Sequence, residues 1–188
     1  MGDAGLRSLR VMSLLLLAVG AALPVRAEDA LRRPFSLEFK GGVLAHDVPL
    51  LWSGFQLEKG ADVNLEVLFG RGLPMLGGNL RPALGTSIST SGHTSRAYLD
   101  ARWEVELPAR FFLGLGLGVA VHDGKLDPFW ADRKALGSRV LFHVPLELGI
   151  RLDDRQSLSV YFEHMSNGNF ASYNEALDSL GVRYGVKF

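Results

Sequence analysis

The sequence has no cysteine, no excess of charge of either sign and, beyond its first residues, no long apolar run. Its 188 residues carry 20 Lys and Arg against 20 Asp and Glu. The lack of cysteine excludes disulfides, thiol chemistry and cysteine-ligated metals. The charge balance argues against a nucleic-acid partner, because binding phosphates requires a surplus of cations. Without apolar runs of about 18 residues or more, a bundle of transmembrane helices is also excluded.

The first 27 residues have the pattern of a secretory signal peptide. Arg7 and Arg10 form a positive segment, an apolar stretch follows over residues 11–23, and Val25 and Ala27 are the small residues before a cleavage site. We therefore expect residues 1–27 to be removed, which leaves residues 28–188 as a single exported domain. This removes three cations and one anion, so the formal net charge falls from zero to −2.

The rest of the chain alternates between apolar and polar residues with a period of two, which predicts β-strands rather than helices. In one segment Leu99, Ala101 and Trp103 alternate with Asp100 and Arg102. Most of these segments are near the length of about 9–11 residues that crosses a bilayer at a tilt. The eight segments are residues 35–43, 62–69, 80–88, 98–107, 113–122, 139–151, 157–163 and 180–188.

The polar faces of these segments favour a membrane barrel. They carry both signs of charge, so they can pair with one another inside a closed barrel while the apolar faces contact lipid. A soluble, lipocalin-like barrel remains the alternative that the alternation alone leaves open. The connections alternate in length, as in outer-membrane barrels. Long ones are predicted at residues 46–61, 89–96, 123–138 and 167–177, and shorter ones at 71–78, 108–109 and 153–155.

The last strand ends in an aromatic residue. Phe188 is preceded by apolar side chains at every second position back to Leu180. Such an ending resembles the assembly signal of bacterial outer-membrane proteins. We therefore predict an all-β fold, an eight-stranded antiparallel transmembrane β-barrel of the bacterial outer membrane, with both termini on the periplasmic side.

Four of the five histidines are expected to have no catalytic role. His46, His93 and His122 fall in or next to outer loops, where we expect solvated side chains, and no metal-binding spacing is present. His143 lies on an inward face near Glu147 and is expected to join the polar interior.

His164 is the exception, because strand parity places it with a serine and an acid. Extending the seventh segment puts His164 and Ser166 on the lipid-facing side, and extending the eighth backward puts Asp178 there too. The two strands are predicted antiparallel neighbours, so the three side chains meet at the outer rim. A serine needs an imidazole to take its proton and an acid to orient that imidazole, so the set predicts acyl transfer. The alternative is that polar residues at a membrane interface are simply hydrated.

These residues carry a resemblance to a known family. The run His164-Met165-Ser166-Asn167-Gly168, followed by residues 174–178, is similar to the end of PagL, the outer-membrane lipid A 3-O-deacylases. The signal peptide, strand number and mature length match as well. The specific part of the resemblance covers about the last quarter of the chain.

The resemblance implies roles for the matching positions. Ser166 would be the nucleophile, His164 the general base and Asp178, 14 residues after the histidine, the orienting acid. Asn167 and the backbone N–H groups near Gly168 correspond to the oxyanion-binding region.

Asn174 also falls on a family position. The resemblance also implies glutamate at the position of Asp178, so we expect Asp178→Glu to have a mild effect, because it restores the family's usual residue. Glu175 is the other candidate acid, but its parity does not place it on the lipid face.

The sequence therefore predicts a serine esterase that hydrolyses the 3-linked acyl chain of lipid A, with no metal or organic cofactor. Its expected partners are lipopolysaccharide and other outer-membrane lipids, and a homodimer is left open. Two alternatives remain. One is a non-catalytic adhesion or structural barrel that binds through Trp52, Phe55, Phe129 and Trp130 on its outer loops. The other is an outer-membrane phospholipase.

Overall fold

The computed structural model describes residues 37–49, 52–70 and 72–188, so the expected signal peptide lies outside the described residues. The structure consists of antiparallel strands and one short 3-10 helix, η1 (Pro108–Arg110). The strands are β1 (Leu37–Ala45), β2 (Ala61–Phe69), β3 (Leu73–Met75), β4 (Gly78–Ser89), β5 (Arg96–Glu106), β6 (Phe111–His122), β7 (Val140–Arg151), β8 (Gln156–Ser166) and β9 (Leu177–Lys187).

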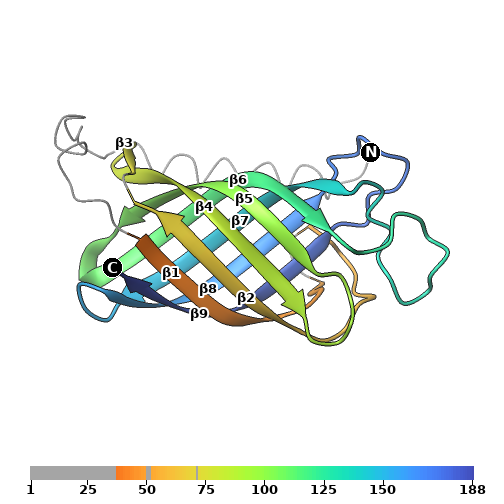
Figure 1. Ribbon diagram of the computed structural model, residues 1–188, viewed down its shortest axis with the longest axis horizontal. Coiled ribbons are helices and arrows are strands. Elements are labelled where there is room, and N and C mark those ends of the chain that lie inside the picture. Colours follow the sequence, from red (N-terminus) through yellow and green to blue (C-terminus); the bar gives the residue numbers. More distant parts are fainter. Residues whose placement is uncertain (1–36, 50–51, 71) are drawn as a thin grey trace.

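Eight of these strands close into a barrel, as the sequence predicted. Each is paired antiparallel with the next around the sheet, β9 pairs with β1, and pairing between β2 and β4 completes the ring (Figure 1). Closure leaves no free sheet edge on which unpaired backbone groups would face lipid. The three-residue strand β3 was not predicted. It pairs with the start of β4 in a hairpin, within the segment expected to be a turn.

The two faces of the wall have the polarity that the sequence predicted. On β5, Asp100 and Arg102 are buried in the interior, whereas Leu99 is 55% exposed on the outside. Leu117 and Val182 are similarly exposed on β6 and β9. An apolar exterior around a polar interior suits a barrel whose wall contacts lipid. Among the residues that the structure describes, no helix is long and apolar enough to cross a membrane.

The interior is filled by ion pairs, and Glu147 is their central acceptor. Its Oε2 accepts hydrogen bonds from Lys40 (2.9 Å), Arg102 (2.8 Å) and Arg183 (2.7 Å). Its Oε1 accepts one from Ser159 (2.6 Å). One carboxylate therefore joins side chains from β1, β5, β7, β8 and β9 across the barrel.

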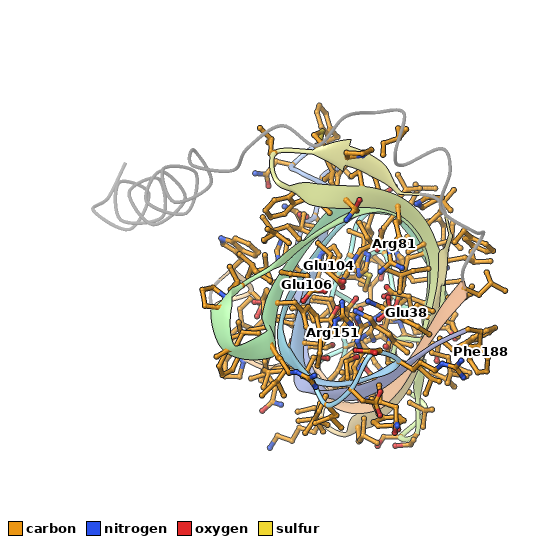
Figure 2. All side chains as sticks on the ribbon, turned by 90° about the vertical axis from the view of Figure 1, so that its left-hand side faces the viewer. Glu38, Arg81, Glu104, Glu106, Arg151 and Phe188 are labelled. Atoms are coloured by element: carbon orange, nitrogen blue, oxygen red, sulfur yellow. The ribbon has the colours of Figure 1, made fainter. Side chains whose placement is uncertain are left out.

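A second cluster of charges lies in the interior near the end with the short turns. Figure 2 views the barrel from this end and shows its labelled side chains inside the ring of strands, whereas Phe188 lies outside. Arg151 donates to Glu38 (3.1 Å) and Glu106 (3.1 Å) and pairs with Glu104. Arg81 donates to Glu38 (2.5 Å).

The histidine predictions were partly wrong. His143 lies in the interior as expected, but its partners are Asp100 (2.9 Å) and Glu163 (3.1 Å) instead of Glu147. His46 is fully buried, and His122 is also buried, where it bonds the carbonyl of Ser138. The expectation of solvated side chains failed because residues of the outer loops bond both rings: Glu58 contacts His46 (3.0 Å), and the carbonyl of Ser138 contacts His122 (2.7 Å).

Three of the four connections predicted to be long are long and lie at one end of the barrel; the fourth, residues 90–95, is shorter than the segment 70–77 at the other end. Three long loops and the shorter loop 90–95 lie at one end, opposite the C-terminus, and loop 123–139 projects furthest from the barrel (Figure 1). The loop between β1 and β2, called loop 46–60, is described over residues 46–49 and 52–60. Its Val48 backbone N–H donates to the carbonyl of Asp178 on β9 (2.8 Å), so this part of the loop lies against the wall.

The base of this loop is held by a buried cluster of charges. His46 donates to Asp62 (2.7 Å) and Glu58 (3.0 Å), Asp62 also pairs with Arg96 (2.8 Å), and the His46 ring stacks on His93. Burial alone would lower the pKa of His46, but its two carboxylate partners raise the pKa above 6.5. Burial would likewise raise the pKa of Glu58, but hydrogen bonds from His46, Thr94 and Lys134 lower it to about 2.

We expect Glu147→Gln to destabilise the barrel by about 3–5 kcal/mol, because three buried cations lose their shared anion. Urea-induced unfolding in lipid vesicles would measure the loss. The matched control is Asp154→Asn, which removes an exposed carboxylate from a turn and should change stability by less than about 0.5 kcal/mol. Equal effects of the two substitutions would contradict a central role for Glu147.

Loop 46–60 should be most protected between about pH 4.5 and 6.5. The raised pKa of His46 gives stability that is complete below 6.5 and is lost as the pH rises through the raised value. The lowered pKa of Glu58 gives stability that is complete above 4.5 and is lost as the pH falls toward 2. Hydrogen exchange of loop peptides, corrected for the intrinsic rate at each pH, would measure the loss of protection on the alkaline side and on the acid side. In His46→Gln the loss of protection on the alkaline side should disappear. If that loss is unchanged in the variant, it is not caused by His46.

Candidate active site

The residues of the predicted triad lie on two neighbouring strands, at the end of the barrel that carries the long loops. His164 on β8 is directly opposite Asp178 on β9, and Ser166 is two residues further along β8. Because residues two apart in a strand share a face, all three occupy the outer side of the wall. These side chains therefore lie on the face that strand parity in the sequence predicts.

The three side chains form a continuous hydrogen-bonded chain. With its proton on Nδ1, His164 donates to Asp178 Oδ1 at 2.6 Å. Ser166 Oγ lies 3.1 Å from His164 Nε2 and donates to it. This is the order that activates a serine: the imidazole can take the hydroxyl proton, and the carboxylate fixes the tautomer.

The three hydrogen-bonded residues differ in burial, which decreases from Asp178 to Ser166. Asp178 is fully buried although its parity points outward, whereas the His164 side chain is 12% exposed and Ser166 is partly exposed. The hydroxyl can thus meet a substrate in the membrane while the acid is shielded from solvent. Shielding strengthens the electrostatic interaction between the carboxylate and the imidazole.

The cover over Asp178 comes from loop 46–60. The backbone N–H groups of Trp52 (3.1 Å) and Ser53 (3.0 Å) both donate to Asp178 Oδ2, the oxygen that His164 does not use. The Trp52 ring packs against the His164 ring, with centroids 4.8 Å apart. This role of the loop could not be predicted from the sequence, because backbone donors 125 and 126 residues away in the chain leave no motif.

Asn167 and Asn174 hold the loop that joins β8 to β9. The Asn167 side chain is buried and donates to the carbonyls of Leu136 (2.8 Å) and Tyr173 (2.5 Å). The Asn167 backbone N–H donates to Asn174 Oδ1 (2.9 Å). The structure brings the two predicted residues together. The Asn167 amide nitrogen also joins this loop to loop 123–139, and the Asn174 amide bonds within its own loop, to Asn169 (3.0 Å).

Gly168 begins the turn beyond Ser166. Its φ of +64° is in the left-handed region, which favours glycine, and a Cβ added there would lie 3.1 Å from the Phe142 ring. Its backbone N–H makes no hydrogen bond within the described part of the chain. This leaves a backbone donor two residues from the serine.

Aromatic side chains border the serine on the β7 side. Phe142 is the cross-strand neighbour of Ser166, and Phe170 lies beside it with ring centroids 6.1 Å apart. Phe170 is 86% exposed. An apolar surface next to the hydroxyl suits a substrate with a hydrocarbon chain.

The alternative acid, Glu175, lies in a different environment. Its carboxylate accepts a hydrogen bond from the backbone N–H of Ala135 (2.6 Å), in loop 123–139. Its own N–H donates to the carbonyl of the same residue (3.0 Å). Asp178 is thus the acid that bonds His164. Over residues 37–49, 52–70 and 72–188, no three His, Asp or Glu side chains are grouped so that they could hold a metal ion.

Comparison with known proteins gives one family and a set of similar folds. The family model described as lipid A 3-O-deacylase (PagL) matches residues 42–187, a range that contains His164, Ser166 and Asp178. A search of curated proteins finds no match.

Three solved structures illustrate the fold. The crystal structure of the outer membrane enzyme PagL has a TM-score of 0.59 and 16% identity, and the match covers 80% of this chain and 98% of that one. The N-terminal β-barrel domain of Pseudomonas aeruginosa OprF has a TM-score of 0.55 and 10% identity over 81% and 97% of the two chains. A de novo designed transmembrane β-barrel has a TM-score of 0.53 and 10% identity over 84% and 98%.

Proposed function

The chain belongs to the PagL family of lipid A 3-O-deacylases, outer-membrane β-barrel enzymes that act on lipid A, and we propose that it works as a serine esterase with Ser166 as its nucleophile. The observation that carries this mechanism is the hydrogen-bonded chain from Ser166 through His164 to Asp178 on the lipid-facing wall. The sequence resemblance to the family is confirmed, as is the prediction of a closed eight-stranded barrel.

The reaction begins when Ser166 Oγ attacks the carbonyl carbon of the ester at the 3-position of lipid A. The hydroxyl proton passes to His164 Nε2, and Asp178 stabilises the imidazolium that forms. His164 then gives the proton to the departing sugar oxygen, which leaves an acyl-serine. Water attacks this ester with His164 as base, and the fatty acid leaves as Ser166 regains its proton.

We propose that the backbone N–H of Gly168 stabilises the oxyanion. It is two residues from Ser166 and has no partner within the described chain. Asn167 and Asn174 support this donor indirectly, because their mutual hydrogen bond holds the first residue of the turn. Preorganised donors of this kind supply a large part of the rate enhancement in acyl transfer.

The position of the triad fits the substrate. Lipid A occupies the outer leaflet, so a hydroxyl on the outer wall near the extracellular rim can meet the ester by lateral diffusion within the membrane. Phe142 and Phe170 border the hydroxyl and would contact the acyl chain. We also propose that residues 1–27 direct export and are removed, so that the enzyme begins at Glu28; intact-mass measurement of the extracted protein tests this.

Ser166→Ala should abolish release of the 3-linked acyl chain while the barrel still folds, because the change is small and lies at the rim. His164→Asn should do the same, since no base remains to accept the hydroxyl proton. Mass spectrometry of lipid A from cells that produce each variant measures the reaction, and the mobility of unheated protein on gels reports folding. Normal deacylation by Ser166→Ala would refute the esterase mechanism, and lack of activity in the unmodified protein would favour a non-catalytic barrel.

Asp178→Asn should lower turnover by up to about 10⁴-fold, the cost of the corresponding change in a soluble serine protease. Asp178→Glu should also lower it, by about 10- to 100-fold, since the extra methylene displaces a carboxylate bonded on both sides. This revises the simple expectation that the family's usual glutamate would be tolerated. Glu175→Gln is the matched control and should retain activity. An inactive Glu175→Gln together with a normal Asp178→Asn would reverse the assignment of the acid.

A further inference from the structure

Loop 46–60 contacts the proposed triad at two points. Its Trp52 and Ser53 N–H groups donate to the free oxygen of Asp178, and the Trp52 ring packs on both His164 and Phe162. The Ser53 hydroxyl donates to the carbonyl of Val48 (3.0 Å), which ties the two contacting stretches of the loop together. The loop thus limits the movement of both the acid and the imidazole.

The Asp47 carboxylate adds a further anchor at the base of the same loop. Asp47 Oδ2 accepts hydrogen bonds from the N–H groups of Leu57 (2.7 Å) and Glu58 (2.9 Å), which closes the loop on itself. Asp47 has a φ of +50° and is fully buried. A strained, buried aspartate persists only where its surroundings hold it.

Lys134, from loop 123–139, provides the external support for this anchor. Its ammonium group lies 3.3 Å from Asp47 Oδ1, donates to the carbonyl of Phe55 (2.5 Å) and sits over the Phe55 ring. Its backbone N–H donates to Glu58 (3.0 Å). The Lys134 side chain is fully buried, so its charge is shielded from solvent and interacts with residues of loop 46–60.

We propose that loop 46–60 is a positioning element for the catalytic acid and base, and that Lys134 is the residue that locks it in place. The inference rests on the proposed serine-esterase function and adds residues to it. Trp52 and Lys134 are positioning residues, because they act on the substrate only through Asp178 and His164. In this arrangement the loop amides bind the oxygen of Asp178 that His164 leaves free, so both oxygens of the acid are held.

The direct test is Lys134→Met, assayed on two substrates, lipid A and a short water-soluble nitrophenyl ester, in the same detergent. If the loop positions the triad, kcat should fall about tenfold or more on both substrates while KM changes by less than about twofold. The matched control is Lys125→Met, in the same loop, which removes a lysine whose ammonium lies over the Trp130 ring. This control should keep full activity on both substrates.

Trp52→Leu provides a second variant that leaves the barrel interior intact, since Trp52 is 43% exposed on the outside. This substitution should lower kcat on both substrates. Trp52→Phe should lower kcat less, because a phenylalanine ring can still contact the His164 ring. Trp130→Leu, at a comparably exposed loop tryptophan, is the control and should be active. If Lys134→Met does not fold, as judged by gel mobility, the Trp52 series alone decides the question.

Two results would overturn the inference. One is an unchanged kcat on the soluble ester in both Lys134→Met and Trp52→Leu. The other is a rise in KM for lipid A alone, which would make the loop a substrate-binding surface. Both differ from failure of the esterase mechanism itself, which would show as activity in Ser166→Ala. If Ser166→Ala is inactive and the loop variants are fully active, the esterase mechanism is supported and only the role of the loop is refuted.

Discussion

The architecture depends on one constraint: strands that cross lipid must pair all their backbone polar groups with one another. The pairing of β2 with β4 meets this constraint by closing the ring. Closure in turn fixes which side chains face lipid and which face the interior, because the two alternate along every strand. That alternation places His164, Ser166 and Asp178 on the outer side of the wall and Glu147 in the interior.

The interior shows the other consequence of closure. Charges such as Glu147 and Arg183 are removed from both water and lipid, so each must be balanced inside the wall. The partners come from strands that are distant in sequence, as when Lys40 of β1 meets Glu147 of β7. The interior network therefore joins opposite walls, and it gives the barrel a rigid frame on which to hold reactive groups at the rim.

The site uses the exterior of that frame. Side chains on the lipid face normally contact only hydrocarbon, yet His164 and Asp178 are shielded there by a loop that folds back over the wall. For the proposed serine esterase this arrangement would be an advantage, because the ester of a membrane lipid could reach Ser166 without leaving the bilayer. The loop supplies the enclosure that a cleft provides in a soluble hydrolase.

Local pattern was enough to predict much of this protein. Period-two alternation predicted the eight barrel strands, and the lengths of the connections predicted that most long loops share one end. Parity along β8 and β9 predicted that His164, Ser166 and Asp178 lie on one face. Strand β3 was not predicted, because a strand of three residues is too short to show the alternation of apolar and polar residues.

Only the tertiary structure decided what the loops do. It buries His46, which the sequence suggested would be solvated, and it directs the amides of Trp52 and Ser53 onto Asp178. The reason is physical. Strand position is encoded by side-chain polarity, which can be seen in the sequence. The path of a loop is set by backbone hydrogen bonds and a few buried charges, such as Asp47 with Lys134, whose partners become neighbours only after the barrel has closed.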